Sequence, residues 1–496
     1  MCAAIQFLCL QSFPFNIFHR SRNAVPETVM QVRSPQFSFD LGRLWRCATS
    51  LLLCVVILGL TGCGFSTPGP SASRTPLKLT LWQGVNPPPN RDILQTLVDR
   101  FNQSHPDIQV ESLYVGQPDQ QMPKILAAVV GNAPPDLLWF NPTLTGQLIE
   151  LEAIRPVDEW LARSPIKDEL DPALYSSMRF EDQLWSMPFD VNNVGIFYRP
   201  SLFKAAGIDT LPKTWDEFRT VARRLTQDTN QDGRIDQHAI QLALGKGEFA
   251  VFTWLPFLWS AGATLERAPV SPTASESGSG SGSGGSGQAA QQSTQSINVR
   301  QPGAIAALQF WRSLITDGSA ILSQPERGYE LDNFLTGKVA MQISGPWTLG
   351  QLQQSGVDFD VFPMPTQRRP ATALGGENLF IFKTTPERER AAFAFAEYAA
   401  SEVFQTEWAL GTGYLPVNLN SRTNPKYRAF IDTQPSLKVF LEQMSVAQSR
   451  PIFPGYQRVS DTLGRALEAT LLGDRTPDAA IQEAQSRLNL IFGTSS

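Results

Sequence analysis

Aromatic and amide side chains stand at the ends of several predicted strands of this chain. Trp82 and Gln83 follow the first predicted strand, Trp139 and Asn141 follow the third, and Trp347 follows a later strand and a Gly-Pro turn. Open α/β sheets bind ligands beyond the carboxyl ends of their strands. Aromatic rings cover the apolar face of a sugar, and amides pair with its hydroxyls. These residues are therefore candidates for carbohydrate binding, with core packing as the alternative for each tryptophan.

Two later segments carry further candidates. Tyr414 lies in the TGYLP loop, and Tyr456 and Arg458 lie in a predicted loop bounded by prolines near the end of the chain. If the ligand carries a phosphate, the Arg458 guanidinium can bind it through two parallel hydrogen bonds. A surface ion pair is the alternative for this arginine.

The cysteines indicate a secreted lipoprotein. All five lie within the first 63 residues, at Cys2, Cys9, Cys47, Cys54 and Cys63. Arginines, a short apolar run and the sequence LTGC at 60–63 follow one another as in a bacterial lipoprotein signal. We expect residues 1–62 to be a leader, Cys63 to carry lipid, and 63–76 to be a flexible tether. An uncleaved membrane anchor is the alternative, and the true start, Met1 or Met30, stays open.

One acidic loop suggests a metal site. Asp228, Asn230, Asp232 and Asp236 are spaced as in a calcium-binding loop. The twelfth position is Ala239 rather than the glutamate that completes such loops. A structural calcium ion and a simple turn between helices are both open interpretations.

Composition argues against other functions. The net charge of −5 offers no basic surface for nucleic acid. Downstream of Cys63 only His105 and His238 remain, and neither fits a zinc or catalytic-triad pattern. No Walker-type glycine loop is present. We expect no catalysis and no cofactor beyond the possible calcium; a secreted glycoside hydrolase with two carboxylates is a remote alternative.

Strands alternate with helices along the chain, which predicts an α/β fold with largely parallel sheets. Thr214 to Glu217 forms a capping box that opens a helix, and helices are also predicted to begin at Thr385-Pro386 and Thr476-Pro477. Residues 271–296 are rich in Gly, Ser and Gln and are predicted to be a surface loop.

Six sequence blocks, in order, resemble the extracellular solute-binding proteins of family 1, which serve importers of sugars and of sn-glycerol-3-phosphate. The blocks are GNAPPD at 131–136, MPFD at 187–190 with FY at 197–198, AGI at 206–208 with PKTWDEF at 212–218, FLTGKVAM at 334–341, GPW at 345–347 and TGYLP at 412–416. The resemblance covers essentially all of residues 77–496.

The resemblance implies a type II periplasmic-binding-protein fold, with a ligand cleft between two lobes that close by a hinge motion. Lobe one would comprise 77–189 plus 375–423, and lobe two 190–374 plus 424–496. Ligand contacts would include two chain crossings, made of Asp190, Asn192 and Asn193, and of Gly375, Gly376, Glu377 and Asn378.

The implied protein is a monomeric binding component of an ATP-driven (ABC) importer, anchored outside the cytoplasmic membrane and delivering its solute to a permease. A neutral sugar or glycoside is the expected ligand. The TGYLP block and Arg458 favour sn-glycerol-3-phosphate or another phosphorylated polyol as the alternative. Binders of that phosphate carry a tyrosine after the second strand, where this chain reads GQPD at 116–119.

Replacing Cys63 by serine should release the protein from the membrane, because no other cysteine follows the predicted cleavage site. Fractionation of cells that express wild type and Cys63→Ser measures this. Retention of the variant in the membrane would favour the uncleaved anchor.

Overall fold

The computed structural model describes residues 75–245, 247–265, 267–269, 295–323 and 331–493. The predicted leader, Cys63 and nearly all of the predicted tether and Gly/Ser-rich loop lie outside these residues. Gln295 and Ser296, which the prediction assigned to that loop, belong to a strand, β11 (Gln295–Ile297), paired with β10 (Arg267–Pro269).

The first five-stranded sheet has the order β2-β1-β3-β16-β6. Its strands are β1 (Leu77–Gln83), β2 (Ile108–Tyr114), β3 (Leu137–Phe140), β6 (Met187–Pro188) and β16 (Asn378–Ile381). β1 pairs in parallel with β2 and β3, whereas β16 is antiparallel to β3 and β6. The late strand β16 thus completes a sheet begun by the N-terminal strands.

The second five-stranded sheet has the order β12-β9-β13-β8-β14. Its strands are β8 (Gly195–Tyr198), β9 (His238–Leu242), β12 (Ala320–Leu322), β13 (Val339–Ser344) and β14 (Asp360–Phe362). β9 is parallel to β12 and β13, and β8 is antiparallel to β13 and β14. The prediction of an α/β fold is confirmed, and both sheets are mixed.

A smaller sheet joins segments that are far apart in the sequence. It has the order β17-β15-β7, with β7 at Asn192–Asn193, β15 at Thr372–Gly375 and β17 at Ala447–Ser449. β7 leads from β6 of the first sheet to β8 of the second, and β15 leads from β14 of the second to β16 of the first. Each of the two segments therefore connects one large sheet to the other.

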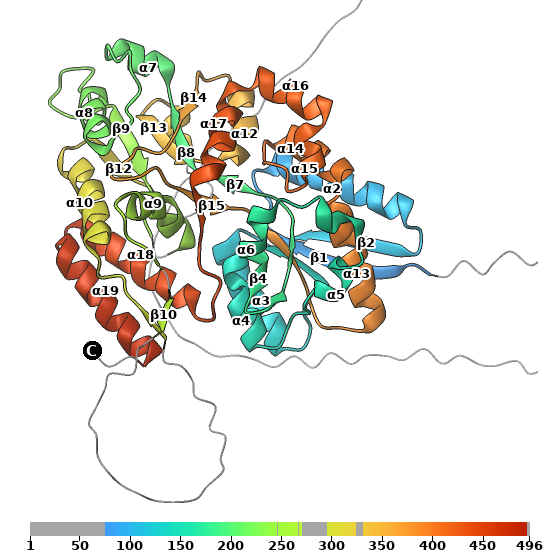
Figure 1. Ribbon diagram of the computed structural model, residues 1–496. Helices are drawn as coiled ribbons and strands as arrows, with labels where there is room; N and C mark the ends of the chain where they lie inside the picture. Colours follow the sequence, from blue (N-terminus) through green and yellow to red (C-terminus); the bar gives the residue numbers. More distant parts are fainter. Residues whose placement is uncertain (1–74, 246, 266, 270–294, 324–330, 494–496) are drawn as a thin grey trace, which may run out of the picture. The chain divides into compact units, whose positions relative to one another are not determined.

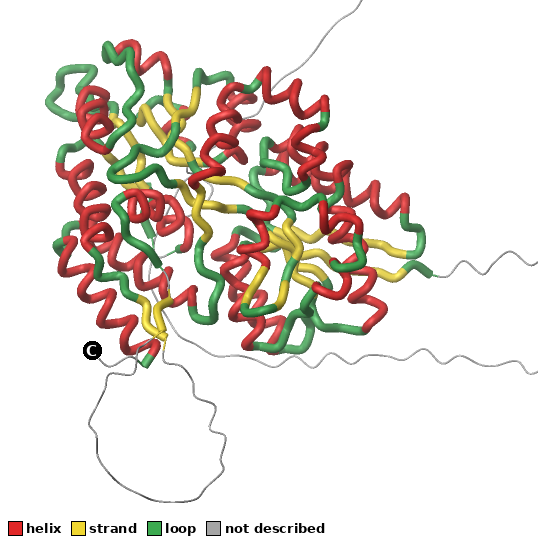
Figure 2. Tube along the Cα trace, in the orientation of Figure 1, coloured by secondary structure: helices red, strands yellow, loops and turns green. Residues whose placement is uncertain are grey.

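Helices surround both large sheets (Figures 1 and 2). They are α2 (Pro88–Ser104), α3 (Pro118–Val130), α4 (Thr145–Glu150), α5 (Asp158–Leu161), α6 (Tyr175–Met178), α7 (Pro200–Ala205), α8 (Trp215–Leu225), α9 (Glu248–Ser260), α10 (Pro302–Thr316), α11 (Asp332–Leu335), α12 (Leu349–Ser355), α13 (Pro386–Ala399), α14 (Glu402–Thr412), α15 (Leu419–Thr423), α16 (Pro425–Thr433), α17 (Pro435–Gln443), α18 (Tyr456–Leu472) and α19 (Pro477–Phe492). The predicted caps are present: Thr214 forms a capping box with Glu217, and Thr385 and Thr476 cap α13 and α19.

Apolar clusters pack against both faces of the first sheet. Successive side chains along each strand point to opposite faces and so belong to different clusters. In β3, Leu137 and Trp139 join one apolar cluster, whereas Leu138 and Phe140 join another with Phe380 of β16. A strand buried on both faces contains an uninterrupted apolar run, which is why LLWF is a strand despite its lack of alternation.

The GNAPPD turn has a structural role. The side chain of Asp136 is 3 % exposed and accepts two hydrogen bonds from Arg388 of α13, both of 2.7 Å. It also accepts the backbone N–H of Thr80 at 2.8 Å. A buried carboxylate is stable only when it is paired in this way, so this turn joins β1, β3 and α13.

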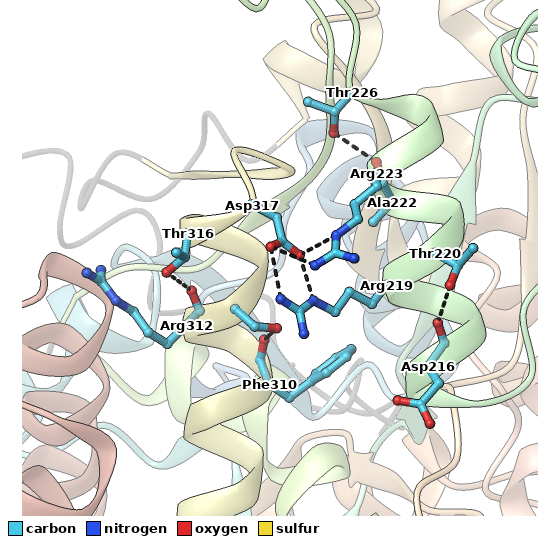
Figure 3. A network of polar contacts seen from close by, with 11 residues as sticks. Asp216, Arg219, Thr220, Ala222, Arg223, Thr226, Phe310, Arg312, Thr316 and Asp317 are labelled. Atoms are coloured by element: carbon cyan, nitrogen blue, oxygen red, sulfur yellow. Dashed lines mark hydrogen bonds and ion pairs between the residues drawn. The ribbon is translucent and has the colours of Figure 1, made fainter.

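A charged network joins α8 to the end of α10 (Figure 3). Asp317 accepts two hydrogen bonds from Arg219, of 2.6 and 2.9 Å, and two from Arg223, both of 3.0 Å. The same two helices are joined by Trp215 and Phe310, which stack with centroids 4.6 Å apart. Bonding to Arg219 and Arg223 holds the pKa of Asp317 well below its usual range.

Asp317→Asn should destabilise the protein by about 1–2 kcal/mol, because two partly exposed guanidinium groups lose their shared counter-charge. Since the folded-state pKa is lowered, the contribution is complete above the unfolded value of about 3.9 and is lost as the pH falls. Urea denaturation from pH 3 to 7, with the exposed Asp209→Asn as control, should show a deficit that narrows in acid. An equal deficit for both variants would exclude a role for the network.

Candidate functional site

One large cavity is lined by residues that lie next to both large sheets. It has a volume of about 1080 Å3, including its open mouth. Its lining residues are Gly84, Asn86, Pro87, Gln117, Pro118, Trp139, Asn141, Asn192, Glu248, Phe249, Phe252, Leu331, Ser344, Trp347, Thr348, Gln351, Gly375, Gly376, Glu377, Tyr414 and Arg450. Several follow the carboxyl ends of β1, β3 and β13, which is where open α/β sheets bind ligands.

Aromatic rings form one part of the cavity wall. The rings of Trp347 and Tyr414 lie 6.5 Å apart with an interplanar angle of 37°, and Tyr414 packs in turn on Trp408 at 5.6 Å. A Cβ at Gly345 would lie 1.9 Å from the Trp347 ring. The GPW block therefore needs its glycine because the indole packs against that α-carbon.

The two crossing segments meet in a contact that excludes side chains. A Cβ on Gly375 would lie 2.2 Å from Oδ1 of Asn192, and one on Gly376 would lie 2.3 Å from the carbonyl oxygen of Asp190. Gly376 also has a φ of +119°, a conformation that favours glycine. The tandem glycines thus let the two crossings touch, and they bring Asn192 and Glu377 to the cavity wall.

Asn192 carries an unused acceptor at this wall. Its Oδ1 is buried and has no hydrogen-bond partner within the described part of the chain. A buried amide oxygen without a partner costs free energy, which a ligand hydroxyl group would recover.

A pair of acidic residues also joins the crossings. Asp190 is buried and accepts the backbone N–H of Glu377 at 2.9 Å, while the carbonyl of Glu377 accepts the backbone N–H groups of Phe189 and Asp190. Burial and the neighbouring Glu377 carboxyl raise the pKa of Asp190 well above its ordinary value, against the opposing effects of the Glu377 backbone N–H and the Trp139 indole. The Asp190 carboxyl therefore keeps its proton to a higher pH than an exposed aspartate.

An ion pair between Glu248, at the start of α9, and Arg450 forms a second charged group. Arg450 donates from Nη1 to Glu248 Oε1 at 2.8 Å, and its guanidinium lies over the Phe252 ring, 4.6 Å from the centroid. The hydroxyls of Tyr456 and Ser460 in α18 also donate to Glu248. An ion pair with three donors to its carboxylate therefore forms part of the cavity wall.

Eight of the residues proposed as ligand contacts line this cavity. They are Trp139, Asn141, Asn192, Trp347, Gly375, Gly376, Glu377 and Tyr414. Lining the cavity does not by itself show that these residues bind a ligand, so their binding roles stay predictions.

Seven proposed contacts do not line this cavity, and two of them lie at the end of β1. Trp82 packs against the apolar cluster on the other face of the first sheet. Gln83 is buried, and its side chain accepts the backbone N–H of Val85 at 2.8 Å. Strand alternation thus directs Trp82 away from the cavity.

Two more belong to the first crossing. Asp190 lies behind the glycines, in a smaller adjacent cavity. Asn193 is buried and donates to the carbonyl oxygen of Phe440 at 2.8 Å. The Asn378 amide, the last residue named for the second crossing, donates to Ser177 and Ser186 instead.

Tyr456 and Arg458 were placed in a loop, but α18 already begins at Tyr456. Residues two apart on a helix point about 200° from each other. Tyr456 is therefore buried against Glu248, whereas Arg458 is exposed and away from the cavity wall.

Sequence reasoning missed much of the cavity wall, notably Glu248, Phe252 and Arg450. α9 is buried all round from Ala250 to Ser260, so it lacks the periodicity that would mark an exposed end. Glu248, a lone acidic residue before an apolar run, was the available signal. Gln117, also missed, stands in the GQPD segment noted above.

The proposed calcium loop gains no support from the structure. Its carboxylates accept backbone N–H groups, with Asp228 bonded to Gly233 at 2.8 Å and Asp236 to Thr229 at 2.9 Å. Among the described residues, no three His, Cys, Asp or Glu side chains are grouped so as to hold a metal ion. Nor does any helix in the described part of the chain have the length and hydropathy of a membrane span.

The fold and a cavity lined from both sheets are those of a bacterial solute-binding protein. The profile of the bacterial extracellular solute-binding protein family matches residues 96–432, and the chain belongs to this family. The predicted family resemblance and fold class are thereby confirmed, as is the prediction that the chain is not an enzyme.

This chain is similar to three named proteins, among others. The maltotriose-binding protein of Pyrococcus abyssi is 21% identical over 360 residues, 71% of this chain and 69% of its own. The sn-glycerol-3-phosphate-binding periplasmic protein UgpB of Salmonella typhimurium is 22% identical over 431 residues, 80% of this chain and 89% of its own. The GacH receptor of Streptomyces glaucescens, solved unliganded and with acarbose, matches the fold with a TM-score of 0.69 and 20% identity, over 84% of this chain and 99% of its own.

Asp190→Asn should make stability less dependent on pH. The amide can still accept the Glu377 N–H, but it carries no titrating proton. Because the folded-state pKa of Asp190 is raised, the wild type should lose stability relative to the variant as the pH rises above about 3.9. Urea unfolding between pH 4 and 7.5 measures this, with the exposed Asp474→Asn as control. A constant difference across that range would show that the pKa of Asp190 is not raised in the folded protein.

Proposed function

We propose that this protein captures a carbohydrate-like solute in the cavity and delivers it to the permease of an ABC importer. The cavity combines the rings of Trp347 and Tyr414 with the unpartnered Oδ1 of Asn192 and the Glu248–Arg450 pair. Rings match the apolar face of a sugar, and the polar groups match its hydroxyls. This pairing of aromatic and polar groups in one wall is the observation on which the proposal rests.

The proposal includes closure of two lobes, 77–189 plus 375–423 and 190–374 plus 424–496, around the ligand. The three-stranded sheet of β7, β15 and β17 supports it, because β7 and β15 connect the two large sheets and their neighbours line the cavity. Hinges of this kind need few residues to change conformation. We further propose a monomer held outside the cytoplasmic membrane by lipid on Cys63.

sn-Glycerol-3-phosphate is the second candidate ligand. Arg450 supports it, since a guanidinium on the cavity wall is the group that phosphate recognition would use. The similarity to UgpB, which binds this phosphate, is consistent with it.

Trp347→Ala and Tyr414→Ala should each weaken ligand binding at least about tenfold, since each removes ring area that the ligand covers. Trp82→Ala and Arg458→Ala, which lie off the cavity, should leave affinity within about twofold. Calorimetry with the tightest ligand from a panel of maltotriose, acarbose and sn-glycerol-3-phosphate measures both.

The same ligand should reduce the radius of gyration in solution scattering if the lobes close. A loss of affinity in Arg458→Ala equal to that in Trp347→Ala would place the ligand outside this cavity. An unchanged radius of gyration with saturating ligand would argue against closure.

A further inference from the structure

The charge on Arg450 is already engaged within the cavity wall. Its side chain is 7 % exposed, Nη1 donates to Glu248, and the guanidinium carbon lies over the Phe252 ring. A phosphate could use this arginine in full only by competing with the Glu248 carboxylate. The ion pair therefore reduces what Arg450 can offer to an anion.

Three hydrogen-bond donors hold the Glu248 carboxylate in place. Tyr456 donates to Oε1 at 3.2 Å, Ser460 donates to Oε2, and Arg450 completes the set. The residue lies in the first turn of α9, where the helix macrodipole stabilises negative charge. Burial and the Glu248 carboxylate raise the pKa of Tyr456 well above its ordinary value, so the phenol remains a donor. The carboxylate thus cannot swing aside to free Arg450 without losing these bonds.

The rest of the wall adds negative charge. Glu377 is a second acidic residue of the lining, and Arg450 is the one basic side chain among the described residues that line the cavity. Because Arg450 offsets only one of the two acidic residues, an entering phosphate would meet a net negative charge in a partly desolvated space, where like charges repel strongly. A neutral polyol could accept from Arg450 and donate to Glu248 without changing the net charge.

We propose that Glu248 determines specificity by excluding anions, so that the site takes uncharged polyhydroxylated ligands and rejects phosphorylated ones. This inference rests on the proposed function and decides between its two ligand classes. Removing the charge of Glu248 while keeping its shape should convert the site into one that accepts a phosphate.

The test compares wild type, Glu248→Gln, the double variant Glu248→Gln/Arg450→Gln and the exposed control Glu442→Gln. Calorimetry at low and high salt uses sn-glycerol-3-phosphate as the anionic probe and maltotriose as the neutral one. Glu248→Gln should bind sn-glycerol-3-phosphate at least about tenfold more tightly than wild type, and salt should reduce the gain. The double variant should lose the gain, and Glu442→Gln should behave as wild type.

Two results would overturn the inference. One is a wild-type Kd for sn-glycerol-3-phosphate below about 100 μM that depends on Arg450, a result that needs no Glu248 variant and stands even if Glu248→Gln fails to fold. The other is a folded Glu248→Gln protein, verified by circular dichroism, without any gain.

The outcomes also separate this inference from the proposed function. Wild-type binding of maltotriose without a gain in Glu248→Gln would leave carbohydrate binding in place and remove the role of Glu248. A gain in Glu248→Gln, with no neutral carbohydrate bound by wild type, would support the charge argument and count against the carbohydrate proposal.

Discussion

The close contact between the two crossing segments is the constraint on which the site depends. Gly375 and Gly376 pack so tightly on residues 190–192 that no side chain fits at either glycine. That approach allows the Glu377 N–H to reach Asp190 and places Asn192 on the cavity wall. One backbone contact thus fixes the polar groups of a wall whose residues come from distant parts of the chain.

The sequence blocks shared with the family divide into two physical classes. Asp136 in GNAPPD and Thr214 in the PKTWDEF block satisfy backbone or guanidinium donors and hold elements together. Trp347 in GPW and Tyr414 in TGYLP instead present rings to the cavity. In this chain, therefore, some of the shared blocks belong to the scaffold and others to the cavity wall.

Charge balance is a defining feature of the cavity wall. Buried charges are stable only when paired. On the wall Glu248 pairs with Arg450, whereas just behind it the buried Asp190 carboxyl, whose pKa is raised, lies next to Glu377. The first contact is an ion pair and the second joins two acids, so the wall is acidic overall. The chain shares about one residue in five with a maltotriose-binding protein and with an sn-glycerol-3-phosphate-binding protein. Overall similarity therefore does not distinguish the two ligand classes, and local chemistry of this kind must do so.

The sequence alone determined the α/β class, the capped helices, the family and eight residues of the cavity wall, because these depend on local patterns and on residues at strand ends. The tertiary structure decided the rest. Trp82 lies on the opposite face of its sheet because the strand register sets that direction. Arg458 lies away from the cavity because α18 begins at Tyr456, so the two side chains point in nearly opposite directions. Arg450 lies on the wall because it directly follows β17, a strand of three residues. The partner of Arg450 is Glu248, 202 residues earlier, and only the folded chain brings such a pair together.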